Sequence, residues 1–146
     1  TGLPPRCQLV AEAGGVRWFN DSKATNVGAT LAALTGIGES IEGKVILIAG
    51  GQGKGQDFSP LAEPARQYLR AGLLMGEDRS TLAQGMSAAP CELVADMQAA
   101  VTRAHALAQP GDAVLLSPAC ASFDMYSSFV ARGDDFSARA REVCHD

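Results

Sequence analysis

The stretch KVILIAGGQGKGQD, residues 44–57, decides the fold class of this chain. Residues 44–49 predict a strand, and their continuous apolar run from Val45 onward is typical of a strand buried on both faces of a parallel sheet. The glycine-rich residues 50–57 predict a loop at the carboxyl end of that strand. Ser59 and Pro60 suit the N-cap and the first position of a following helix, so the order strand, loop, helix indicates an α/β protein.

The same alternation continues on both sides of this stretch. Residues 7–12 and 16–20 are typical of two strands joined by a tight turn, which predicts an N-terminal β-hairpin. We therefore predict a Rossmann-like α/β fold, with a doubly wound, mostly parallel sheet and helices on both faces. The further expected strands are 71–76, 91–94 and 113–116, and the expected helices are 26–35, 59–68, 80–86, 96–108 and 123–143, the last broken near Gly133.

The composition indicates one soluble globular domain over residues 1–146. Hydrophobic residues make up 47% of the chain, enough for a real core. The net charge of -4 argues against binding to nucleic acid, and no apolar run approaches the roughly 20 residues of a membrane span. The four cysteines are widely spaced and only two histidines occur, so we expect no metal site. The proline-containing start, residues 1–6, is typical of a linker from a neighbouring domain.

Three polar loops follow strand carboxyl ends, at residues 21–26, 50–57 and 117–122. In open α/β sheets, ligands bind outside the carboxyl ends of the strands. We therefore expect the three loops to converge on one cleft.

The first loop precedes a helix whose N-terminus would offer free backbone N–H groups and a positive dipole end to an anion. Asp21 can accept from sugar hydroxyls, Lys23 can meet a phosphate and Thr25 can donate to a carboxylate. The alternative is structural, with Thr25 or Asn26 as the helix cap and the rest as a solvated turn.

The glycine-rich loop fits neither common phosphate motif. A Walker loop would need glycine in place of Ile48, and a dinucleotide fingerprint would need glycine in place of Gln56. We expect this loop to hold neither a triphosphate nor NAD by itself. It still presents one cation, Lys54, near backbone amides, which suits either an anion site or a plain strand-to-helix turn.

The third loop offers Ser122, either as a hydroxyl donor or as the N-cap of the next helix. Cys120 has the chemistry of a nucleophile, but neither histidine lies in any of the three loops. We therefore expect a small buried thiol there and no Cys–His pair.

The three loops in this order resemble those of the C-terminal domain of the Mur ligases, and the resemblance covers the whole chain. It is carried by LPPR at residues 3–6, WFNDSKATN at 18–26, GGQGK at 50–54 and LSPACASFD at 116–124. Sister ligases that add other amino acids carry a different segment in place of residues 21–26. The resemblance is therefore closest to the members that add D-glutamate.

The resemblance implies a cytoplasmic, monomeric, three-domain enzyme of peptidoglycan synthesis. One domain would hold UDP-N-acetylmuramoyl-L-alanine, a central domain would hold ATP and Mg²⁺, and the C-terminal domain would bring D-glutamate. ATP would phosphorylate the substrate carboxylate, and the amine of D-glutamate would attack the acyl phosphate. Residues 1–146 would form the C-terminal domain alone, without the UDP-binding and ATPase domains, so we expect the isolated domain to be inactive and to contain no catalytic residue.

The resemblance also assigns individual residues. It places three beside ATP, namely Arg6, Asp21 and Lys23. It places five around D-glutamate, namely Thr25, Lys54, Ser122, Phe123 and Phe129. These side chains suit the ligand, because a dicarboxylate needs a cation and several hydrogen-bond donors.

Two other interpretations remain open. The chain can be the C-terminal domain of a sister ligase that adds another amino acid, although residues 23–25 argue against it. It can also be a stand-alone module that binds an anion or an amino acid on the same scaffold.

Overall fold

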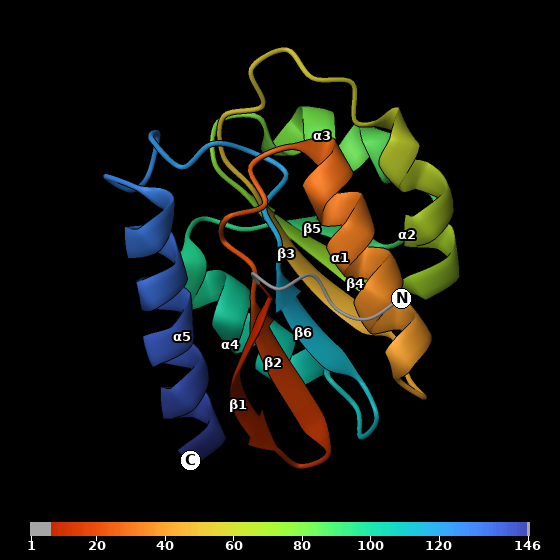
Figure 1. Cartoon of the computed structure of the whole chain (residues 1–146), viewed down its shortest axis with the longest axis vertical. Helices are drawn as coiled ribbons and strands as arrows, with labels where there is room; N and C mark the ends of the chain where they lie inside the picture. The colour runs from red at the N-terminus through yellow and green to blue at the C-terminus, as the bar shows by residue number, and fades with distance from the viewer. Residues whose placement is uncertain (1–6, 146) are drawn as a thin grey trace.

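The computed structural model describes residues 7–145 and shows a six-stranded sheet with helices on both faces (Figure 1). The sheet order is β1-β2-β6-β3-β4-β5. Only the β1–β2 pair is antiparallel, so the predicted hairpin and mostly parallel sheet are confirmed. The strands are β1 (Gln8–Ala13), β2 (Val16–Asn20), β3 (Val45–Gly50), β4 (Leu69–Met75), β5 (Cys91–Leu93) and β6 (Ala113–Leu116).

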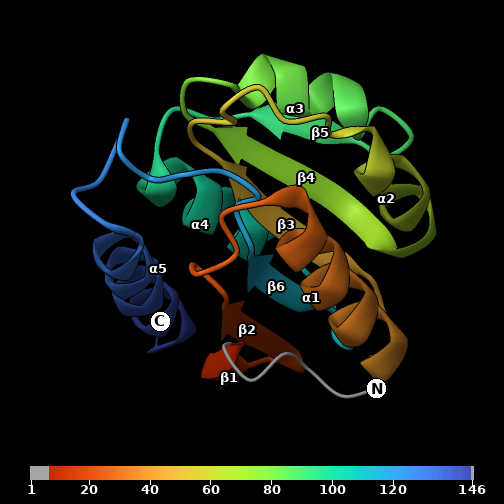
Figure 2. The same cartoon turned by 45° about the horizontal axis from the view of Figure 1, so that its top comes forward.

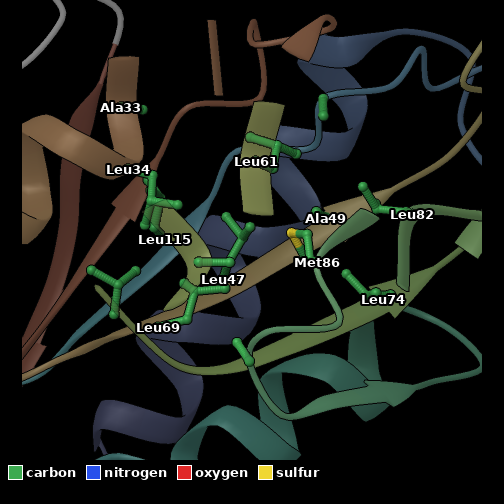
Figure 3. Close-up of a cluster of buried hydrophobic side chains, with 14 of the residues drawn as sticks. Ala33, Leu34, Leu47, Ala49, Leu61, Leu69, Leu74, Leu82, Met86 and Leu115 are labelled. Atoms are coloured by element: carbon green, nitrogen blue, oxygen red, sulfur yellow. The ribbon is translucent and has the colours of Figure 1, made fainter. Parts of the chain in front are cut away.

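The helices divide between the two faces of the sheet (Figure 2). Residues of α1, α2 and α3 pack with Leu47 and Leu115 in one buried cluster (Figure 3). Residues of α4 and α5 pack with Ile46 and Val114 in the other. The helices are α1 (Val27–Ser40), the 3-10 turn η1 (Ser59–Leu61), α2 (Ala62–Tyr68), α3 (Arg79–Gly85), α4 (Met97–Leu107) and α5 (Phe129–His145).

The central strands supply apolar side chains to both clusters because successive residues of a strand point to opposite faces. β3 and β6 are buried along their whole length, as the run at residues 44–49 predicts. Trp18 of β2 packs near Phe136 of α5, with ring centroids 6.2 Å apart. Helices therefore cover both faces of the sheet, and the loops lie at its carboxyl edge.

The last helix differs from the prediction. It begins at Phe129, where the Ser128 hydroxyl accepts from the Ala131 amide at 3.1 Å, so Ser122 does not cap it. It also continues through Gly133. A Cβ at Gly133 would lie 2.8 Å from Asn20 Nδ2, so glycine at this position lets the helix approach the end of β2 closely. Here glycine serves packing and does not break the helix.

Candidate functional site

The three polar loops meet at the carboxyl edge of the sheet, at the top of Figure 1, and backbone hydrogen bonds join them. Ala119 N donates to Ala24 O at 2.9 Å, which ties the third loop to the first. Gln52 and Ala121 exchange two bonds of 3.0 Å, which tie the third loop to the second. Gly51 allows that approach, because a Cβ there would overlap Ala121 O.

The first loop is anchored by a buried polar chain. Asp21 is fully buried, and its Oδ2 accepts from the Ser117 hydroxyl at 3.1 Å. Thr30 of α1 donates its hydroxyl to Ser117 O, also at 3.1 Å. Lys23, by contrast, is exposed. The predicted pair of nucleotide contacts therefore divides into one buried acid and one surface cation.

The helix after the first loop begins as predicted. Asn26 is the N-cap of α1, and its Oδ1 accepts from Ala29 N at 2.9 Å. The cap is therefore Asn26 and not Thr25. Thr25 lies half-buried just before it, so its hydroxyl is not used as the cap.

The second loop presents Lys54 at the tip of a tight turn. Lys54 is exposed and has a φ of 56°, a left-handed conformation that non-glycine residues rarely adopt. The turn is closed by the Gln56 N–H, which donates to Gly53 O at 3.1 Å. The backbone at Lys54 therefore has a defined turn geometry, although the loop is rich in glycine.

The third loop contains a buried thiol, as predicted. Cys120 is fully buried, and burial raises the pKa of its thiol to about 12. A thiol in this state does not serve as a nucleophile at neutral pH. Ser122 is only 3% exposed, whereas the next residue, Phe123, is 68% exposed.

Arg132 of α5 joins the first and third loops through three hydrogen bonds, and we call this arrangement the Arg132 clamp. Its Nε and Nη2 donate to Ser22 Oγ and Ser22 O at 2.9 Å each, and its Nη1 donates to Cys120 O at 3.0 Å. The side chain is 1% exposed, and burial lowers its pKa to about 10, so it is still a cation at neutral pH. Among the residues that the structure describes, Arg132 forms no ion pair.

A hollow of about 270 Å³ lies between the end of β2 and the start of α5. It brings together two residues predicted for different ligands, Lys23 and Phe129. The full lining is Gln8, Asn20, Ser22, Lys23, Phe129, Val130, Gly133 and Asp134. Both polar and apolar side chains surround it, which suits an amphipathic small molecule.

The predicted residues are thus placed on one edge, but not all in one hollow. Arg6 lies outside the described residues. The other seven belong to the three loops, to the residue directly after the third loop, or to the start of α5. Ser117 and Arg132 were not predicted as site residues, and they join segments as far as 96 and 110 positions apart along the chain. Arg132 stands among charged residues of a helix, a pattern typical of a solvated face, so no local signal identified it.

Residues 7–145 contain no group of three or more histidine, cysteine or acidic side chains that could hold a metal ion. Every helix in the same range is too short or too polar to traverse a lipid bilayer.

The family model described as "Mur ligase, glutamate ligase domain" matches residues 5–120. The chain belongs to the Mur ligase C-terminal domain family. The predicted resemblance is therefore confirmed, and the three joined loops are the carboxyl edge of a Mur ligase domain.

Curated Mur ligases are similar to this chain over nearly all of its length. The UDP-N-acetylmuramoylalanine--D-glutamate ligase of Alcanivorax borkumensis is 88% identical over 100% of this chain and 33% of its own length. The protein of the same name from Nitrosococcus oceani is 58% identical over 98% of this chain and 31% of its own length. The chain spans about a third of the length of these relatives.

Solved Mur ligases share the fold at low sequence identity. A UDP-N-acetylmuramoyl-L-alanyl-D-glutamate--2,6-diaminopimelate ligase superposes with a TM-score of 0.66 at 15% identity, over 100% of this chain and 33% of that one. The MurF ligase from Thermotoga maritima, solved in complex with ADP, gives 0.60 at 14% identity, over 98% of this chain and 32% of that one. These likenesses support the α/β architecture of the Mur ligase domain.

Proposed function

We propose that this chain is the amino-acid-binding domain of a longer ATP-dependent ligase that joins D-glutamate to UDP-N-acetylmuramoyl-L-alanine in peptidoglycan synthesis. The observation that carries the proposal is the 88% identity, along all 146 residues, to a relative named as the D-glutamate ligase. An active ligase would need the parts of those relatives that this chain does not span. We expect the complete ligase to work as a cytoplasmic monomer and the domain alone to be inactive.

The three loops supply what a dicarboxylate needs. Lys54 offers an exposed ammonium group, and Thr25 offers a hydroxyl just before the start of α1. Ser122 of the third loop and Phe129 at the start of α5 would contact the rest of D-glutamate. Phe123, being exposed, would contribute apolar contact to the ligand or to a neighbouring domain.

Of the three residues predicted to contact ATP, two are described by the structure, and they differ in exposure. Lys23 is exposed and can reach a phosphate of ATP held by another domain. Asp21 is buried against Ser117, so direct contact with ATP would require the first loop to open. Arg6 remains a predicted contact outside the described residues. Mg²⁺ would neutralise phosphate charge when bound by the other domains, and we assign no step on this chain to it.

In the proposed reaction, this domain orients the amine of D-glutamate. The carboxylate of UDP-N-acetylmuramoyl-L-alanine would take the γ-phosphoryl group of ATP and release ADP. The amine would then attack the acyl carbon, and inorganic phosphate would leave as the amide bond forms. The contribution of this chain is to hold the nucleophile in place, which converts a bimolecular attack into a positioned one.

A chimera tests the proposal. This chain replaces the matching third of the Alcanivorax borkumensis ligase, and phosphate release is measured with ATP, UDP-N-acetylmuramoyl-L-alanine and either D- or L-glutamate. We expect release that depends on D-glutamate. Absence of such release from a folded chimera would contradict the proposal, and binding of D-glutamate by the isolated chain in that case would favour the stand-alone module.

Lys54→Ala in the chimera should raise the KM for D-glutamate by about 10- to 100-fold, because it removes one charge-assisted hydrogen bond. The KM for ATP should change by less than about threefold on the same reasoning. Lys44→Ala is the matched control, because Lys44 is exposed at the opposite edge of the sheet. Equal effects on both substrates would contradict the role of Lys54.

A further inference from the structure

The turn that presents Lys54 has an unusual backbone. Its two central residues, Lys54 and Gly55, have φ values of 56° and 74°, which is typical of a type I′ turn. Gly55 adopts this conformation freely, whereas Lys54 is strained in it. A strained non-glycine residue persists only where the surroundings hold it in place. The source of that constraint is therefore informative about the site.

Gln56 supplies the constraint, because its side chain bonds to the second loop, to the third loop and to the first residue of α1. Its Nε2 donates to Gly53 O at 2.9 Å, across the base of the Lys54 turn. The same Nε2 donates to Ala119 O in the third loop, also at 2.9 Å. Its Oε1 accepts from Val27 N, the first residue of α1, at 2.9 Å. One amide group thus joins the glycine-rich loop to the third loop and to the start of α1.

An amide is the group that satisfies this position. The three contacts require two donors toward carbonyl oxygens and one acceptor toward an N–H, which is the inventory of a glutamine side chain. Ala119 also has a positive φ, of 62°, so the bond from Gln56 reaches a second strained residue. The hydrogen bonds of the Gln56 side chain therefore stabilise the backbone at both described non-glycine residues with a positive φ, Lys54 and Ala119.

We propose that Gln56 is a positioning residue for D-glutamate, which acts by holding Lys54 and the N-terminus of α1 in one fixed arrangement. This inference rests on the proposed function, because it takes Lys54 as the cation for the substrate carboxylates. Gln56 itself need not touch the substrate. Its role is to fix the turn that presents Lys54 against the start of α1 and the third loop before the ligand arrives, which lowers the ordering cost of binding.

Two substitutions in the chimeric ligase test the proposal. Gln56→Ala removes all three contacts, and Gln56→Glu keeps the shape and the acceptor but sets a carboxylate against two carbonyl oxygens. We expect both variants to raise the KM for D-glutamate by about tenfold and to leave the KM for ATP within about twofold. Gln67→Glu is the matched control, because Gln67 is exposed where β4 begins, at the other edge. We expect it to behave as the unsubstituted chimera.

The pH dependence of Gln56→Glu separates positioning from a general loss of structure. When the introduced carboxyl group is protonated, it regains one donor toward a carbonyl oxygen, and the two nearby oxygens favour that neutral form. The ratio of variant to unsubstituted KM for D-glutamate should therefore fall toward one as pH decreases from about 8 to 5.5, a range set by the elevated pKa of such a carboxyl group. Gln56→Ala should show a constant ratio over the same range.

The outcomes separate the two proposals. If the unsubstituted chimera uses D-glutamate and both Gln56 variants match it, Gln56 does not position the site and the proposed function stands. If the variants raise the KM for ATP as much as that for D-glutamate, Gln56 has only a structural role and the inference is again overturned. If the unsubstituted chimera shows no use of D-glutamate, the proposed function fails first. A selective rise in the KM for D-glutamate with recovery at low pH supports the inference.

Discussion

The two edges of the parallel sheet differ in how a buried charged side chain is satisfied, because, within residues 7–145, Asp112 at one edge forms a direct ion pair and Arg132 at the other does not. At the amino edge, Asp112 is 1% exposed and its two oxygens accept two hydrogen bonds from Arg70, at 2.6 and 3.0 Å. The amides of Lys44 and Gln109 each add one of 2.9 Å. At the carboxyl edge, the three contacts of Arg132 are all to neutral oxygens.

This difference separates an edge whose buried charge is directly paired from an edge whose buried cation is held by neutral oxygens. The Asp112–Arg70 pair cancels its own charge, so little field extends beyond it. Arg132 forms no direct ion pair among the described residues, and Asp124 favours its charged form only at longer range. The three bonds of Arg132 also hold the first and third loops together. Lys54 and Lys23 are exposed on the same edge.

The largest expected effect comes from Arg132→Met. Three buried oxygens would each lose a donor, which predicts a loss of about 4 kcal/mol in the free energy of unfolding. Urea unfolding of the 146-residue chain measures it. Arg141→Met is the matched control, because Arg141 is exposed on the same helix and makes one bond, to Val10 O; it should cost about 0.5 kcal/mol. Similar losses for the two variants would show that Arg132 is no clamp.

Asp112→Asn should have the next largest effect, and it should depend on pH. Burial alone would raise the pKa of Asp112, but the bonds from Arg70 and from the two amides outweigh burial and lower it below 3.8. The stabilisation is therefore complete above the ordinary pKa and is lost as pH falls through the lowered value. We expect Asp112→Asn to cost about 2 kcal/mol at pH 7, a figure that allows for the partial exposure of Arg70.

The pH profile of unfolding checks this prediction. The gap between the unsubstituted chain and Asp112→Asn should narrow as pH falls below about 3.8, because the unfolded chain then binds a proton at Asp112 more readily than the folded chain, whose pKa is lower. The variant, in the chimera, should keep the KM for D-glutamate, because its edge lies away from the loops. A gap that stays constant down to about pH 2.5 would show that the charge of Asp112 contributes nothing.

The smallest expected effect is that of Gly133→Ala, which tests how closely α5 must approach the first loop. The added Cβ would lie 2.8 Å from Asn20 Nδ2 and 3.1 Å from Ser22 Cβ, so the helix must shift. We expect a loss of about 1 to 2 kcal/mol in thermal or urea unfolding. Gly28→Ala in α1 meets only an ordinary contact of 3.5 Å and should stabilise by about 0.5 kcal/mol. Equal signs for the two glycines would contradict the close approach.

Much of the fold followed from short-range patterns. The run at residues 44–49 predicted a doubly buried strand because burial on both faces requires apolar side chains throughout, and β3 is buried at every position. Asn26, one of the two candidates for the first cap, and Asp96 each accept from the amide three residues ahead, whereas Ser59, predicted as an N-cap, is the first residue of η1 and caps no helix. The prediction for the last helix was wrong at Gly133. Glycine has a low helix propensity, but here it allows α5 to pack closely against the end of β2.

For the candidate site, the sequence predicted its location at the carboxyl edge of the sheet but not the contacts within it. The order of strands and loops placed residues 21–26, 50–57 and 117–122 at strand carboxyl ends, which is a consequence of parallel topology. The resemblance named individual residues there, and their roles remain predictions. In the sequence, Gln56 is notable only because it stands where a dinucleotide-binding fingerprint would need glycine. The local pattern gives no indication of its three hydrogen bonds.

The amino-acid sequence by itself determined the alternation of strands and helices, the caps of α1 and α4 and the location of the polar loops, because each depends on neighbours within a few positions. Only the tertiary structure decided the partners of Gln56, Asp112 and Arg132. Their hydrogen bonds join segments up to 110 positions apart, and such contacts exist only after the sheet has brought those segments together. A charged or amide side chain has the same local pattern whether it is solvated or buried, and what separates the two cases is the surroundings that the fold supplies.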